Sequence, residues 1–200
     1  ETGFVIERAP LVGGVPGTFL QIATAPANPA NGTTTFLDTT VLDGSAYAYQ
    51  VREQNAAAVS TPSNVATVTT PMAAPSGLTL TGSNVPARVV LAWADNAGAE
   101  TAYTVVRDGA TVATLPAGST GWTDTTVVDG ASYSYLVTAS NALGSASTAA
   151  QTVTLALAAP SGTTAAVTAS APRTVTVGWV DNSVSETGYT VQRATNATFT

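Results

Sequence analysis

The sequence repeats itself at a spacing of about 86 residues, and this repetition constrains the fold more than any other feature. The segment Trp-Ala-Asp-Asn at 93–96 returns as Trp-Val-Asp-Asn, and the two tryptophans are 86 positions apart (179 − 93). Four blocks recur in the same order: 93–96 at 179–182, 100–107 at 186–193 and again at 1–8, 38–49 at 124–135, and 74–77 at 159–162. A chain built this way is expected to stack copies of one small structural unit.

The repeat begins at the Ala-Pro-Ser-Gly block, which predicts one complete domain and two partial ones. Residues 73–157 hold the complete domain, residues 1–72 the C-terminal part of one, and residues 158–200 the N-terminal part of another. The chain lacks an initial Met and a signal-like apolar segment, so we expect a mature chain or a piece of a longer one. Two explanations of the partial domains stay open: a window on a longer array, or completion of one copy by the next.

The sequence of the complete domain predicts seven short strands and no helix. Each run is rich in β-branched and aromatic residues and is bounded by Pro, Gly, Asn or Asp: 77–81, 88–93, 101–107, 110–115, 121–124, 132–139 and 148–154. Tyr133, Tyr135 and Val137 alternate with polar residues, which is the period of a half-buried strand. Seven such strands in about 85 residues are typical of a β-sandwich.

These residues resemble the fibronectin type III family, in its bacterial form. The resemblance rests on Pro75 before the first strand, Trp93 on the second, the Tyr-x-Val-x-Arg pattern at 103–107 on the third, and the pattern of 127–139 around the sixth. It implies an all-β fold of tandem immunoglobulin-like seven-stranded β-sandwiches, one complete and two partial. It also implies that Tyr133 makes a tyrosine corner. Asp129 departs from animal modules, which usually carry Pro at this turn.

The resemblance and the repeat together predict a structural core. Trp93 would lie between the two sheets, and the aromatic residues at matching positions would pack beside it. The predicted core residues are Trp93, Trp179, Tyr103, Tyr189, Tyr47, Tyr133 and Tyr135.

The composition excludes most catalytic chemistry. The chain has no Cys and no His, and its basic residues are all Arg, so imidazole bases, thiol nucleophiles, Lys Schiff bases and Cys or His metal ligands are absent. We therefore expect no enzyme, cofactor or metal. A net charge of −6 disfavours nucleic acid and anionic membranes. The lack of an apolar run of about 18 residues predicts no membrane span.

The carboxylates that remain have two interpretations each. Paired Asp and Asn at 95–96 and 181–182 suit either calcium or a turn whose backbone they hydrogen-bond, and we favour the turn. Glu100 and Glu186 suggest a glycosidase-like pair. They occur once per repeat at equivalent positions, which favours a structural role in every domain.

The first partial domain carries 13 more residues between its third and fifth strands than the complete domain does, counted from Arg8 to Asp38 and from Arg107 to Asp124. We expect a longer loop with a fuller fourth strand at 19–24. The alternative is an exposed contact surface made by Phe19, Leu20 and Ile22.

The function expected from these features is structural and extracellular. Short Pro- and Ala-containing linkers at 70–75 and 157–160 limit the freedom between domains, as in a stalk, an adhesin spacer or a filament of a bacterial surface protein. The partners would be neighbouring repeats, copies of the same chain, or cell-surface or extracellular polysaccharide. The alternative is a spacer or carbohydrate-binding accessory module of a secreted carbohydrate-active enzyme. Trp122 is the one tryptophan outside the predicted core.

Overall fold

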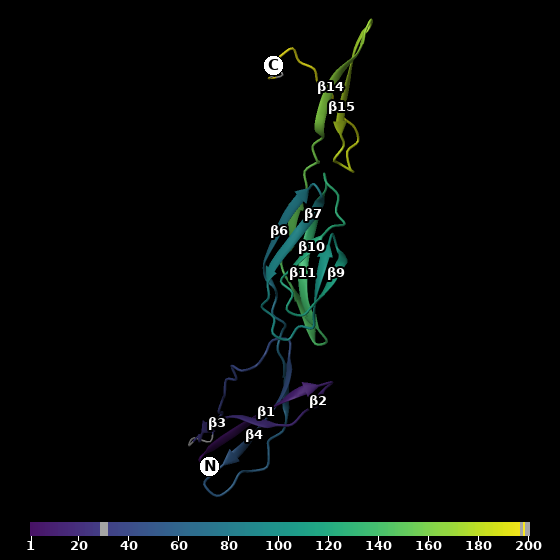
Figure 1. Ribbon diagram of the computed structural model, residues 1–200. Coiled ribbons are helices and arrows are strands. Elements are labelled where there is room, and N and C mark those ends of the chain that lie inside the picture. The colour runs from purple at the N-terminus through teal and green to yellow at the C-terminus, as the bar shows by residue number, and fades with distance from the viewer. Residues whose placement is uncertain (29–31, 197, 199–200) are drawn as a thin grey trace. The chain divides into compact units, whose positions relative to one another are not determined.

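The computed structural model describes residues 1–28, 32–196 and 198, and every regular element within them is a β-strand. No helix of these described ranges is long and apolar enough to cross a membrane. In chain order (Figure 1), the strands are β1 (Gly3–Val12), β2 (Val15–Pro16), β3 (Leu20–Pro26), β4 (Ala46–Gln54), β5 (Ala66–Thr69), β6 (Ser76–Asn84), β7 (Ala87–Ala94), β8 (Ala102–Arg107), β9 (Ala110–Pro116), β10 (Gly121–Asp124), β11 (Ser132–Asn141), β12 (Gly144–Ser147), β13 (Gln151–Thr154), β14 (Ser161–Ser170) and β15 (Arg173–Val180).

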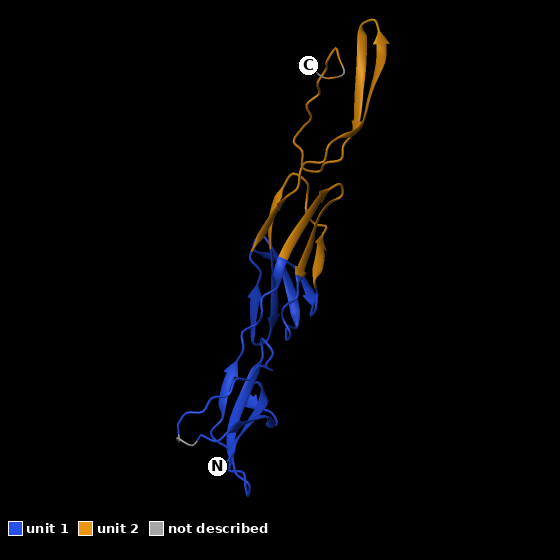
Figure 2. Ribbon diagram, turned by 90° about the vertical axis from the view of Figure 1, so that its left-hand side faces the viewer, with its two compact units in different colours: residues 1–77, 94–119, 136–149 blue, residues 78–93, 120–135, 150–200 orange. Residues whose placement is uncertain are grey.

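The chain divides into two compact units, which Figure 2 shows in two colours. Unit 1 contains residues 1–77, 94–119 and 136–149. Unit 2 contains residues 78–93, 120–135 and 150–200. The middle repeat contributes to both units, so each unit holds parts of two repeats.

Strand β1 is the centre of the first sheet of unit 1. It pairs with β4 at one edge and with β2 and β3 at the other, and β5 pairs with β4. Gly13 and Gly14 turn β1 into β2 with φ values of 59° and 81°, which glycine adopts without steric cost. The fuller fourth strand expected near 19–24 is β3, and it pairs with β1 from Gly3 to Arg8.

A second five-stranded sheet is centred on β8 and β11. Its order is β12-β11-β8-β9, and β13 also pairs with β11. Alternate residues are fully buried, which is the period of two expected for strands with one inward face. They are Tyr103 and Val105 on β8, and Tyr135, Val137 and Ala139 on β11.

Unit 2 contains a three-stranded sheet of order β10-β7-β6 and a separate two-stranded sheet of β14 and β15. On β7, Val89, Leu91 and Trp93 are buried, and the residues between them are exposed. Large apolar residues also alternate along the sequence of β15. In this strand, however, all residues but one are exposed.

Two residues predicted to lie in the core are exposed instead. Trp179 is 36% exposed and Tyr189 is 41% exposed, whereas their equivalents Trp93 and Tyr103 are buried. Residues 158–200, as far as they are described, contain no counterpart of strands β9 to β13, which cover the equivalent face of the middle repeat. The prediction was therefore wrong for Trp179 and Tyr189. Of the other predicted core residues, Tyr47 and Tyr135 are buried and Tyr133 is half-buried.

The seven runs predicted between residues 77 and 154 each overlap an observed strand. Residues 186–193 repeat the sequence of the predicted third strand, and residues near Asp38 correspond to the predicted fifth strand. Neither segment is a strand in the described part of the chain. A strand needs a hydrogen-bonding partner. Strand β10, the counterpart of 35–38, pairs with β7, and the described part of residues 1–72 contains no counterpart of β7. Strand β8, the counterpart of 186–193, pairs with β9 and β11, and the described part of residues 158–200 contains no counterpart of either.

Candidate functional site

Asp43 holds the linker that follows the first repeat. Its Oδ2 accepts a hydrogen bond of 2.9 Å from the Ala73 amide, and its Oδ1 accepts one of 2.7 Å from the Gly98 amide. Ala73 belongs to the linker, and Gly98 belongs to the loop after β7 in the middle repeat. One carboxylate thus binds the linker and a loop of the following repeat.

Asp129 occupies the equivalent position 86 residues later and makes the same type of contacts. Its Oδ2 accepts hydrogen bonds from the Ala158 amide at 2.8 Å and from the Ser183 hydroxyl at 2.6 Å, and its Oδ1 accepts one of 3.3 Å from the Val184 amide. The side chain of Ser185 also donates to the Asp129 carbonyl at 2.6 Å. The Asp at this turn therefore accepts a hydrogen bond from a backbone amide at both linkers.

These hydrogen bonds, above all the one from the Ala158 amide, lower the pKa of Asp129 from 3.8 to about 2. A carboxylate whose pKa is depressed by folding stabilises the folded state above its unfolded pKa. We therefore expect the Asp129 contacts to be intact above about pH 4 and to be lost as the pH falls toward 2.

A second pair of hydrogen bonds to each linker recurs in both repeats. The Asn96 amide group donates to the Ala74 carbonyl and to the Ser76 hydroxyl, both at 2.9 Å. Asn182 repeats this with the Ala159 carbonyl at 2.8 Å and the Ser161 hydroxyl at 2.9 Å. The turn interpretation of these Asn residues agrees with their contacts, since they bind backbone and hydroxyl groups of the linker.

Of the other predicted carboxylates, Asp95 and Asp181 bind their own loops, and Glu100 binds the loop after β9. Asp95 Oδ1 accepts a hydrogen bond of 3.0 Å from the Ala97 amide and another from the Tyr103 hydroxyl, and Asp181 accepts one of 3.1 Å from the Ser183 amide. Glu100 accepts a bond of 2.9 Å from the Gly118 amide. Within the described residues there is no group of three or more acidic, His or Cys side chains that could hold a metal ion.

The tyrosine corner implied by the resemblance is present in two repeats. The Tyr133 hydroxyl accepts a hydrogen bond of 2.9 Å from the Val128 amide, and the Tyr47 hydroxyl accepts one of 3.0 Å from the Leu42 amide. Each tyrosine thereby ties the turn that carries Asp129 or Asp43 to the strand that follows it. The corner positions the junction carboxylates.

A buried carboxylate lies at the end of β10, and an equivalent one lies in the first repeat. Asp124 is fully buried and accepts hydrogen bonds from the Tyr135 hydroxyl at 2.9 Å and from the Thr126 amide at 2.8 Å. Asp38 accepts one of 2.8 Å from Tyr49 and forms an ion pair of 2.7 Å with Arg8. Burial alone would raise the pKa of Asp38, but hydrogen bonds from Thr40, Tyr49 and Arg8 lower it to about 2.

One junction residue was missed by the sequence analysis. The Asn141 side chain, at the end of β11, donates to the Gly44 carbonyl at 2.8 Å and to the Ala99 carbonyl at 2.7 Å. It therefore joins the turn of the first repeat to the loop that contains Gly98. Its counterpart 86 residues earlier is Asn55, and the Oδ1 atom of each Asn accepts hydrogen bonds from two amides of the turn that follows. The repeat therefore marks the position as a turn residue, and it gives no signal for the contact with Gly44.

The proposed contact surface of Phe19, Leu20 and Ile22 lies on and just before β3. Leu20 is 65% exposed, and Phe19 and Ile22 are half-buried. The position agrees with either interpretation, and the contact surface stays a prediction.

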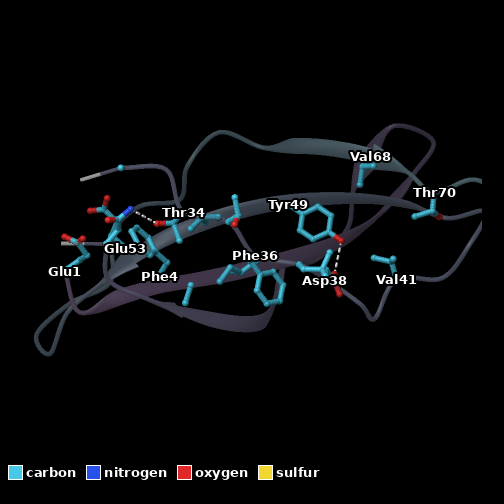
Figure 3. A pocket seen from close by; sticks show the side chains of 17 residues that line it. Glu1, Phe4, Thr34, Phe36, Asp38, Val41, Tyr49, Glu53, Val68 and Thr70 are labelled. Atoms are coloured by element: carbon cyan, nitrogen blue, oxygen red, sulfur yellow. Dashed lines mark hydrogen bonds between the residues drawn. The ribbon is translucent and has the colours of Figure 1, made fainter. Parts of the chain in front are cut away.

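The first repeat also has an open apolar hollow of about 940 Å³. Figure 3 shows Phe4, Phe36, Tyr49 and Val68 around it, with the Tyr49 hydroxyl directed at Asp38. Tyr49 is the equivalent of the fully buried Tyr135, but it is only half-buried. The face that is covered in the middle repeat is therefore open in the first.

No family model and no curated protein matches the chain. Among solved structures, a segment of two fibronectin type III domains from chicken tenascin matches with a TM-score of 0.54 and 11% identity, over 76% of this chain and 83% of that one. The chicken interferon gamma receptor alpha chain matches with a TM-score of 0.45 and 12% identity, over 78% of this chain and 87% of that one. The tenascin likeness shows the fold: an all-β, immunoglobulin-like sandwich of the fibronectin type III kind.

Proposed function

We propose that this chain, with its fibronectin type III fold, is a non-enzymatic structural segment that spaces or links parts of an extracellular bacterial protein, such as a stalk, an adhesin or a filament. The observation that carries the proposal is the repeated junction. Asp43 and Asp129 each bind a linker amide and an amide of the loop that follows it. The resemblance to bacterial repeats supports the extracellular location.

The distribution of polar contacts supports a spacer better than an enzyme. The carboxylates accept hydrogen bonds from turns, linkers and tyrosine hydroxyls of their own surroundings. A catalytic pair would occur once, in one pocket, with free oxygens directed at substrate. These carboxylates recur at equivalent positions and act on the backbone, as expected for groups that set the geometry between repeats.

The test is to measure how strongly neighbouring repeats tumble together, by ¹⁵N NMR relaxation of the wild type and of the double variant Asp43→Ala/Asp129→Ala. We expect one slow rotational correlation time along the wild-type chain. In the double variant, the flanking repeats should tumble about twofold faster because their linkers are released. Glu53→Ala is the matched control, since it removes one exposed carboxylate of β4 away from the junctions.

Independent tumbling of the repeats in the wild type would contradict the proposal. So would a double variant with the same relaxation as Glu53→Ala. Retention of the folded-state amide spectrum in each variant separates a loss of coupling from a loss of folding.

A further inference from the structure

We propose that the thioether of Met72 is an oxidation site, at which hydrogen peroxide releases the junction between the first and the middle repeat. The inference rests on the proposed structural role and adds a way to regulate it. The 200 residues contain one Met and no Cys, so the Sδ atom of Met72 is their only sulfur atom. Oxidation of sulfur by a mild oxidant therefore maps to one position, in the linker between these two repeats.

The main chain on both sides of this methionine is bound to the Asp-Gly turn of the first repeat. The Gly44 amide donates to the Pro71 carbonyl at 3.0 Å. The Ala73 amide donates to Asp43 Oδ2 at 2.9 Å, and the same carboxylate accepts the bond from the Gly98 amide of the middle repeat. The methionine therefore stands between the two bonds that fix the linker to the turn.

The Met72 side chain is packed against this turn and is only 8% exposed. The φ of Gly44 is 54°, and a methyl group on its Cα would lie 2.6 Å from Met72 Cε and 3.1 Å from Met72 Sδ. The thioether thus fills the space that a side chain at this position would need. The same methyl group would lie 3.0 Å from Asn141 Nδ2, which belongs to the middle repeat. The sulfur is therefore buried where the two repeats meet.

Oxidation would place a polar oxygen atom in this packed site. Hydrogen peroxide transfers one oxygen to Sδ, its O–O bond breaks and water leaves, so the sulfur loses two electrons and the peroxide gains them. The donors beside the sulfur are already used, since the Gly44 and Ala73 amides hold the linker and the Asn141 amide group binds two carbonyls. A buried oxygen without a hydrogen bond is costly. The sulfoxide must therefore compete for these bonds or leave the site, and either change opens the junction.

The second linker makes the same contact with a residue that contains no sulfur. Leu157 takes the place of Met72 at an offset of 85 (157 − 72), which is the offset of the Ala-Pro-Ser-Gly block. A methyl group on Gly130 would lie 2.8 Å from Leu157 Cδ2, although Leu157 is 53% exposed. A hydrocarbon side chain offers no lone pair to a peroxide. Hydrogen peroxide is therefore expected to act on the first junction and to spare the second.

The test treats the full chain with dilute hydrogen peroxide and then removes the peroxide with catalase. Peptide mapping by mass spectrometry measures the oxygen added at Met72, and ¹⁵N relaxation follows the tumbling of each repeat. Met72→Leu is the matched control, because it nearly conserves volume and copies the residue of the second linker. Reduction of the oxidised chain by methionine sulfoxide reductase with a thiol is the second control.

We expect the first repeat to tumble about twofold faster once Met72 carries one oxygen, because its linker is released. The amide signals of Gly44, Ala73 and Gly98 should shift. The amide signal of Ala158, at the second junction, should stay in place. Peroxide-treated Met72→Leu should keep the relaxation of the untreated wild type, and the reductase should restore it in the oxidised chain. Retention of the remaining amide signals shows that the oxidised chain is still folded.

Complete oxidation of Met72 with unchanged tumbling and unshifted junction amides would overturn the inference, and so would an equal response of Met72→Leu to peroxide. Complete resistance of Met72 in the folded chain to a peroxide dose that oxidises it in urea would overturn it as well. Each of these results leaves the proposed function standing if Asp43→Ala/Asp129→Ala still releases the repeats. Independent tumbling of the repeats before oxidation would instead overturn the proposed function, and the shifts at Gly44 and Ala73 would still test the oxidation site.

Discussion

Leu91→Ala is expected to lower the free energy of unfolding of the middle repeat by about 3 kcal/mol, because it removes a fully packed side chain and leaves a cavity. Leu91 is 1% exposed on β7, between the buried residues Val89 and Trp93. The measurement is urea unfolding followed by circular dichroism and tryptophan fluorescence.

Val177→Ala is the matched control, since Val177 is the repeat equivalent of Leu91 and is 38% exposed. In dilute protein, this variant should lose less than about 1 kcal/mol, as expected for a partly exposed site. Equal losses in the two variants would contradict the assignment of the closed core to the middle repeat.

Asp124→Ala is expected to destabilise the middle repeat by about 3 kcal/mol, because it removes a buried hydrogen-bond acceptor and leaves donors without it. Asp124 accepts bonds from the Tyr135 hydroxyl and from the amide and hydroxyl of Thr126. Thermal and urea unfolding of the variant and the wild type provide the comparison.

Tyr135→Phe separates the contribution of the hydroxyl from that of the carboxylate. It retains the ring and removes one donor to Asp124, so the expected loss is about 1 kcal/mol. If Tyr135→Phe cost as much as Asp124→Ala, the buried carboxylate would have no structural role beyond this single bond.

The repeat and the period of two were sufficient to predict the fold. Alternating residues such as Tyr133, Tyr135 and Val137 indicated strands, and each predicted run of the middle repeat overlaps an observed one. These signals are local or depend on comparison within the chain, so a single sequence contains them. Trp93 and Tyr103 are buried where the resemblance to fibronectin type III domains placed them.

The failures have a common physical cause. Trp179 and Tyr189 stand at the positions of core residues in the repeat. Their burial depends on a covering sheet, which the described part of residues 158–200 does not contain. Residues 186–193 have a sequence typical of a β-strand, but a strand forms only when a second strand supplies its backbone hydrogen bonds. Sequence pattern describes what a segment prefers, and the presence of its partner decides whether that preference is realised.

The sequence marks Asp129 only as a turn residue that stands where animal modules usually carry Pro. Its contacts with Ala158 and Val184 reach residues 29 and 55 positions away. Such contacts depend on tertiary geometry, and neither composition nor spacing predicts them. Asn141 belongs to the same class.

The most direct test of the account is amide hydrogen exchange of the dilute wild-type chain, resolved by residue. The repeats share one sequence pattern, but among the described residues only the middle repeat has a closed core. We predict strong protection at β7 and β10, and fast exchange at the equivalent residues 175–178 and 35–38. Equal protection at all these positions in dilute protein would contradict the claim.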